Sequence, residues 1–243
     1  MVEKILRGDQ EAAAKLISKI ENEPDSTLEE IKFLEEKIVP AHILGITGPP
    51  GVGKSSLIAC LLERFRRNNG KVAVLAIDPS SPFTGGALLG DRIRMQMHSS
   101  DEGVFIRSMA TRGHLGGLSK AAADTLKVLT AWGAGTVIVE TVGVGQGEVE
   151  IMKVASTILV VLSSGQGDDI QMMKAGILEI GDIFVINKAD QGDAENLERN
   201  LKQYGRKKGE WIPAVVKTVA TENTGIDELC KKIDEHRKYV KQN

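Results

Sequence analysis

The chain has 243 residues, with 31 Lys and Arg against 33 Asp and Glu, a net charge of −2 and a pI of about 6.1. This balance argues against a binder of nucleic acid or anionic membranes that relies on bulk charge, and an aromatic content of 4% leaves few platforms for stacking on single-stranded nucleic acid. Cys60 and Cys230 form neither a disulfide framework nor a metal-binding pair, and the N-terminus shows no apolar signal core, so we expect a cytoplasmic protein.

Residues 1–40 are predicted to form a helical N-terminal appendage with a packing role. Apolar residues recur at helical spacing over residues 2–20, and a turn that contains proline then interrupts the pattern. Ser26 or Thr27 is placed to cap a second helix after this turn.

Residues 41–243 are predicted to form one nucleotide-binding domain, because short β-branched strands alternate there with helical stretches. This pattern is typical of an α/β fold of the P-loop NTPase kind, a doubly wound, mostly parallel sheet with helices on both faces. The predicted strands are residues 43–47, 72–77, 104–107, 136–140, 158–162, 183–187 and 214–217. The predicted helices are residues 54–67, 118–132, 146–154, 169–179, 193–204 and 226–240.

The segment GPPGVGKS, residues 48–55, has the spacing of a phosphate-binding loop and lies between a predicted strand and a predicted helix. Its backbone N–H groups and the helix N-terminus are expected to cradle phosphate oxygens. The ammonium of Lys54 would reach the β- and γ-phosphates, and the hydroxyl of Ser55 would bind Mg²⁺. The residues expected to contact the nucleotide here are Gly48, Pro50, Gly51, Val52, Gly53, Lys54, Ser55 and Ser56.

Three acidic residues follow predicted strands or lie in adjacent loops: Asp78, Asp91 and Glu140. The apolar run that ends at Glu140 has the Walker-B pattern, which places a carboxylate near Mg²⁺ or its waters. Gly143 follows in the string ETVG, where its N–H can sense the γ-phosphate. The polar, glycine-bearing segment that begins at Asp78 is expected to be a mobile loop.

The string NKAD at the end of strand 183–187 predicts that the base is guanine. The Asp190 carboxylate can accept hydrogen bonds from N1–H and the 2-amino group, donors that adenine does not offer at these positions. The stem of Lys188 can cover the base, and Asn187 can brace the phosphate-binding loop. Backbone groups of Val219 and Ala220, after the last strand, are the natural contacts for guanine O6.

Three long segments, residues 78–95, 107–118 and 140–150, strongly resemble the methylmalonyl-CoA mutase-associated GTPase chaperones, a group also labelled arginine/ornithine (LAO/AO) transport ATPases. The resemblance implies a GTPase that docks onto an adenosylcobalamin-dependent acyl-CoA mutase. Such a GTPase gates cofactor loading and protects the mutase from inactivation. GTP and this mutase are therefore the expected partners, and neither nucleic acid nor a membrane is expected.

The same resemblance implies that Mg²⁺ is surrounded by Ser55, Asp78, Asp91 and Glu140. It also implies a third mobile loop, residues 163–174, which carries Lys174 toward the nucleotide. The residues expected to act in catalysis are Lys54, Asp91, Glu140 and Lys174. Because the family dimerises through a further C-terminal helical arm and this chain ends at Asn243, a homodimer stays an open expectation.

The residue that would position the attacking water is not evident. In the Ras pattern a glutamine follows the switch glycine, whereas here Val144 follows and Gln146 comes later, so we expect hydrolysis on the order of 10⁻⁴–10⁻² s⁻¹. Candidate charge stabilisers, for which structural or partner-facing roles are favoured, are Arg92, Arg94, Arg107 and Arg112. Two alternatives stay open, a transport-linked ATPase or kinase for amino-acid-binding proteins and a metal-insertion GTPase, although the scattered histidines speak against the latter.

Overall fold

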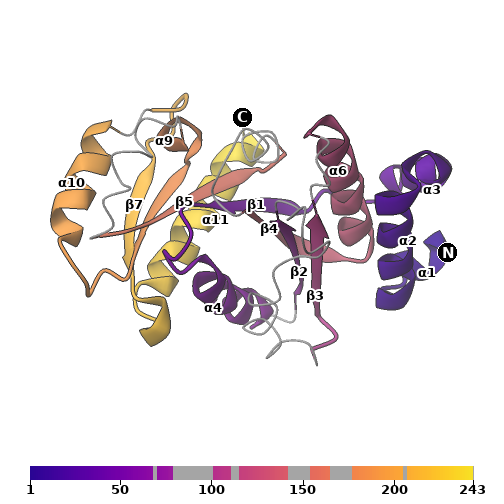
Figure 1. The fold of residues 1–243 in the computed structure, drawn as a ribbon, viewed down its shortest axis with the longest axis horizontal. Helices are drawn as coiled ribbons and strands as arrows, with labels where there is room; N and C mark the ends of the chain where they lie inside the picture. The colour runs from indigo at the N-terminus through magenta and orange to yellow at the C-terminus, as the bar shows by residue number, and fades with distance from the viewer. Residues whose placement is uncertain are drawn as a thin grey trace, which may run out of the picture. The chain divides into compact units, whose positions relative to one another are not determined.

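The computed structural model describes residues 1–67, 70–78, 101–110, 115–141, 154–164, 177–204 and 207–242. Seven strands form one sheet in the order β3-β2-β4-β1-β5-β6-β7 (Figure 1). The strands are β1 (His42–Thr47), β2 (Lys71–Asp78), β3 (Val104–Ala110), β4 (Ala134–Thr141), β5 (Thr157–Ser163), β6 (Ile183–Asn187) and β7 (Ala214–Thr218). The helices are α1 (Val2–Leu6), α2 (Gln10–Asn22), η1 (Pro24–Thr27), α3 (Leu28–Glu35), α4 (Lys54–Arg66), α6 (Leu115–Ala131), α9 (Ile177–Ile180), α10 (Ala194–Tyr204), η3 (Ala220–Glu222) and α11 (Ile226–Gln242).

Each of the seven predicted strands overlaps a strand of the structure. The pairs β2–β3, β1–β5, β5–β6 and β6–β7 are parallel. Every residue of β5 and β6 is buried, as expected for central strands of a sheet with helices on both faces. The α/β fold with a doubly wound, mostly parallel sheet is thus confirmed.

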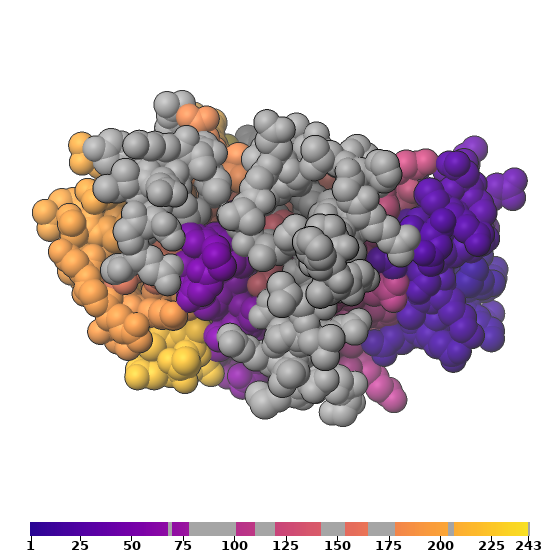
Figure 2. All heavy atoms as spheres, in the orientation of Figure 1, coloured from indigo at the N-terminus to yellow at the C-terminus, as the bar shows by residue number. Residues whose placement is uncertain are grey.

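The described residues group by their contacts into two units, and the first comprises Met1–Ile43 and Phe65–Val139. In this unit β2 and β3 pair from Val72 and Val104 to Asp78 and Ala110. Helices α2 and α3 pack against α6 (Figure 1), and Figure 2 shows residues 1–40 in indigo as one continuous body of atoms. The N-terminal helices are therefore an integral layer of this unit's core.

The N-terminal segment differs in two details from the sequence-based expectation. The apolar pattern over residues 2–20 belongs to two helices, because Gly8 has a φ of 86° and the Asp9 carboxylate caps α2 by accepting from Ala12 N at 2.9 Å. The break is anchored by Trp132 Nε1, which donates to Gly8 O at 3.0 Å. The expected side-chain cap of the helix after the proline turn is wrong, since the Thr27 hydroxyl instead donates to a carbonyl within η1.

The second unit comprises Leu44–Arg64 and Glu140–Asn243. Its strands pair in the order β1, β5, β6, β7, so that Ser163 lies opposite Asn187 and Asn187 opposite Thr218. Helix α10 packs on β6 and β7, and α11 packs on β5, β6 and β7. The carboxyl ends of these strands therefore share one edge, where the expected binding loops begin.

Two predicted helices fall largely outside the described residues. Of residues 146–154 only Val154 is described, and of residues 169–179 only the part that overlaps α9. Across the described ranges, none of the helices has both the length and the apolar run that crossing a bilayer requires.

Candidate functional site

The predicted phosphate-binding loop connects β1 to α4, and its backbone requires glycine at two close approaches. Gly48 has a φ of 145°, and a Cβ there would lie 2.1 Å from Val161 O. Gly53 has a φ of 92°, and a Cβ there would lie 2.4 Å from Asn187 Nδ2. The loop is thus packed against the carboxyl half of β5 and the end of β6, with Pro50 and Gly51 exposed at its tip.

Lys54 is the first residue of α4, and its side chain turns back over the loop. It is 8% exposed, and its Nζ donates to Gly48 O at 2.8 Å and to Pro49 O at 2.9 Å. Ser56 follows on the same helix and is half-buried. A buried ammonium beside a helix N-terminus makes this loop an attractive environment for anions.

Ser55 and Glu140 meet although they are far apart in the sequence. Ser55 Oγ donates to Glu140 Oε1 at 3.4 Å, and the residues are 7% and 6% exposed. Glu140 lies near the end of β4, as the Walker-B pattern predicts. A hydroxyl and a carboxylate are hard oxygen donors, the ligand types that Mg²⁺ prefers.

Asn187, at the end of β6, joins three loops. Its Nδ2 donates to Val52 O at 2.9 Å, and its Oδ1 accepts from Thr218 Oγ1 at 3.0 Å and from Ala220 N at 3.2 Å. Asn187 is 2% exposed, so these bonds are shielded from water. The bond to Val52 O is the contact that the expected bracing role of Asn187 requires, whereas the contact with Thr218 was not predicted from the sequence.

The residues after Asn187 turn sharply over the phosphate-binding loop. Lys188 has a φ of 54°, and its Nζ donates to Gly51 O at 2.8 Å. Ala189 N donates to Thr218 O at 3.1 Å, which ties this turn to the end of β7. Asp190 is exposed beyond the turn, accessible to a ligand.

The backbone after β7 forms a compact turn, residues 218–225, which we name the β7 turn. Val219 pairs with Thr224 through an isolated antiparallel bridge, and both Val219 and Ala220 are buried at 8% exposure. Ala220 O accepts from Asn223 N at 3.3 Å and from Cys60 Sγ at 3.2 Å. The contact from Cys60 on α4 was not predicted, because nothing in the local sequence links positions 160 residues apart.

Most of the other predicted residues lie outside the part of the chain that the structure describes, and one described residue, Arg107, lies elsewhere. Asp91, Gly143 and Lys174 lie outside the described residues, as do Arg92, Arg94 and Arg112. Asp78 is the last residue of β2, and its side chain is also outside the description. Arg107 instead pairs with Glu21 and Ser18 of α2, which favours the structural role.

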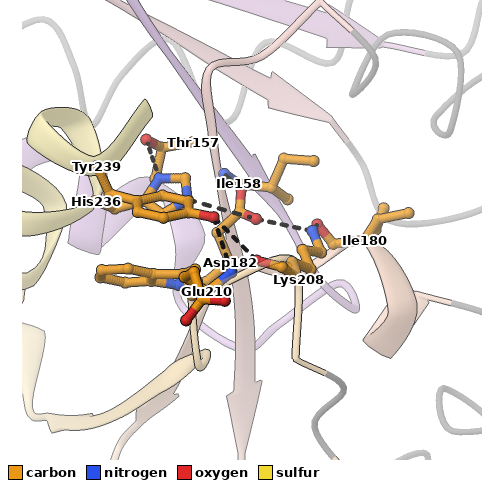
Figure 3. Close-up of polar contacts among 9 residues, drawn as sticks. Thr157, Ile158, Ile180, Asp182, Lys208, Glu210, His236 and Tyr239 are labelled. Carbon is orange, nitrogen blue, oxygen red and sulfur yellow. Dashed lines mark hydrogen bonds and ion pairs between the residues drawn. The ribbon is translucent and has the colours of Figure 1, made fainter. Parts of the chain in front are cut away.

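A second polar cluster lies at the opposite, amino end of β5 and β6 (Figure 3). His236 Nδ1 is 2.8 Å from Thr157 Oγ1, and its Nε2 is 3.7 Å from Asp182 Oδ1, an oxygen that also accepts from Lys208 Nζ at 2.8 Å. Burial lowers the pKa of His236, opposed by the Asp182 carboxylate, while Lys208 lowers it further. Thr157 is completely buried, and its contact with His236 joins α11 to the sheet.

Comparisons with known proteins identify the family. Residues 13–243 match the family model described as methylmalonyl-CoA mutase-associated GTPase MeaB. A Pyrococcus abyssi protein that carries the name GTPase is 52% identical over 100% of this chain and 76% of its own length. The fused isobutyryl-CoA mutase of Geobacillus kaustophilus is 38% identical over 84% of this chain and 20% of its own length.

A solved structure supports the same assignment. The LAO/AO transport system kinase is 26% identical, with a TM-score of 0.77 over 99% of this chain and 75% of that chain. The P-loop NTPase fold expected from the sequence is therefore confirmed. With a family model that spans nearly its whole length, this chain belongs to the methylmalonyl-CoA mutase-associated GTPase MeaB family.

Proposed function

We propose that this protein is a Mg²⁺-dependent GTPase that acts as a switch-type chaperone for an adenosylcobalamin-dependent acyl-CoA mutase, with residues 41–243 as its nucleotide-binding part. The observation that carries the proposal is the set of Asn187 hydrogen bonds to Val52, Thr218 and Ala220. These bonds hold a phosphate-binding loop and two strand-end turns in one group. These three loops, held together, could bind a guanine nucleotide with its phosphates at the N-terminus of α4 and its base beside Asp190.

The proposed roles follow from the chemistry of each side chain. Lys54 exchanges its loop carbonyls for β- and γ-phosphate oxygens, and the N-terminus of α4 adds its partial positive charge. Ser55 and Glu140 would hold Mg²⁺, together with Asp78 and Asp91 by resemblance. When bound, this ion neutralises charge on the phosphates. Gly143 is proposed to sense the γ-phosphate, and Lys174 to approach the nucleotide.

The acyl-CoA mutase is proposed as partner because the family description and one relative's name both refer to such an enzyme. GTP binding would order the switch loops, and hydrolysis would release them. We propose that intrinsic GTP hydrolysis is slow and that the mutase accelerates it. The protein is proposed to act in the cytoplasm. A pull-down with GTP- and GDP-loaded protein tests this switch, and equal capture of the mutase by both forms contradicts it.

Base recognition is tested by Asp190→Asn. The amide can accept from N1–H and donate to O2 of xanthine, whereas it loses the charged acceptor for guanine. We expect GDP affinity to fall by about 100-fold and XDP affinity to rise, measured by titration calorimetry. Asp234→Asn, an exposed change on α11, is the matched control. Unchanged GDP affinity in Asp190→Asn would show that Asp190 does not contact the base.

The competing function is the alternative left open by the sequence, phosphate transfer to an amino-acid-binding protein, and one similar solved structure is named a LAO/AO transport system kinase. Incubation with γ-labelled GTP or ATP distinguishes the two. Label that appears only as inorganic phosphate, with GTP preferred, supports the GTPase. Label on a protein acceptor, or equal use of ATP, supports the kinase.

A further inference from the structure

The β7 turn is held by side chains from two other parts of the second unit. Ala220 N donates to Asn187 Oδ1 at 3.2 Å, and Ala220 O accepts from Cys60 Sγ at 3.2 Å. The backbone N–H and the backbone carbonyl of Ala220 therefore each bond a side chain from outside the turn. Asn187 comes from the end of β6, and Cys60 comes from α4, the helix that begins at the phosphate-binding loop.

The rest of the turn leaves little freedom for movement. Gly225 has a φ of 76°, and a Cβ there would lie 2.1 Å from Lys217 O. Asn223 adopts a left-handed conformation with a φ of 60° at the end of η3. A small displacement of the Ala220 carbonyl would therefore also displace the N–H group of Ala220.

The chemical state of Cys60 suits a hydrogen-bond donor. Burial raises the pKa of its thiol, and the nearby Glu63 carboxylate raises it further against the effect of Arg64. The protonated thiol is a weak donor, which matches an acceptor such as the Ala220 carbonyl. A thiolate could not make this contact.

We propose that Cys60 is a positioning residue for base recognition: its thiol holds Ala220 O so that the Ala220 N–H, which donates to Asn187 Oδ1 in the structure, can also donate to O6 of guanine. The inference rests on the proposed GTP-binding function and adds one residue to it. Cys60 itself does not touch the nucleotide. Its contribution is therefore specific to contacts made at O6 and absent from contacts made to the phosphates.

The test compares GDP with 6-thio-GDP, in which a weakly accepting sulfur replaces O6 while N1–H and the 2-amino group are retained. For Cys60→Ala we expect the Kd for GDP to rise about 3- to 10-fold, the range for loss of one hydrogen bond. The Kd for 6-thio-GDP should stay within about twofold of wild type. Cys60→Ser, whose hydroxyl also donates, should recover part of the GDP affinity.

Cys230→Ala, at the other cysteine on α11, is the matched control and should leave both Kd values unchanged. Equal weakening of GDP and 6-thio-GDP in Cys60→Ala would indicate a general structural effect and overturn the proposal. Unchanged GDP affinity in this variant would overturn it as well. A wild-type protein that binds neither ligand would instead refute the proposed GTPase function, and the positioning role with it.

Discussion

Replacing Asn187 by alanine should destabilise the nucleotide-free protein as well as weaken nucleotide binding. The change removes three hydrogen bonds, to Val52 O, Thr218 Oγ1 and Ala220 N, from a residue that is 2% exposed. A buried polar group left without its partner costs about 1–3 kcal/mol. Taking the lower figure for each bond, because the Thr218 hydroxyl can rotate to another acceptor, gives a loss of about 3 kcal/mol.

The free energy of unfolding is measured by urea denaturation without nucleotide, with circular dichroism as the signal. A loss of this size should also lower the Tm by about 6–12 °C. Asn196→Ala on the exposed side of α10 is the matched control and should change the free energy by less than about 0.5 kcal/mol. A loss of less than about 1 kcal/mol in Asn187→Ala would show that the hydrogen bonds of Asn187 do not hold these loops together.

Three further predictions concern positions outside the base-contacting loops. Gly48→Ala should lower the free energy of unfolding and raise the Kd for the nucleotide at least about tenfold, measured by titration. The reason is that the new Cβ would lie 2.1 Å from Val161 O, at a φ that is unfavourable for alanine. Burial lowers the folded-state pKa of His236 below 6.5. The free energy of unfolding should therefore keep its full value above pH 6.5 and decline as the pH falls below it. His236→Gln should remove this pH dependence, measured by urea denaturation at a series of pH values. Arg107→Ala should lower the free energy of unfolding by about 1–3 kcal/mol through the loss of its half-buried pair with Glu21, while nucleotide affinity stays within twofold by titration.

Much of the fold could be predicted from local sequence. The central strands β5 and β6 are buried on both faces, so each appears in the sequence as a short continuous run of apolar, mostly β-branched residues. Such runs could be recognised as strands. The phosphate-binding loop and NKAD could be recognised because their chemistry depends on residues close together in the chain. The alternation of strands and helices indicated that the sheet is mostly parallel, whereas the order of the strands was not predicted.

The remaining features depend on tertiary contacts. The break at Gly8 was hidden because the apolar period continues across it, and its stabilising partner, Trp132, lies 124 residues away. The expected cap by Thr27 failed because its hydroxyl found a closer carbonyl within η1. The link from Cys60 to Ala220 could not be predicted, since only the folded sheet brings α4 beside the β7 turn.

The Asn187 bonds also have a consequence for the order of folding events. They join positions 135 residues apart on one side and 33 residues apart on the other, so the loop closure that they require is entropically costly, and we expect it to occur late in folding. A ligand that spans these loops would stabilise only chains in which that closure is complete. Hydrogen exchange with and without GDP should therefore show protection spread across β1, β6 and β7 together, as one cooperative unit.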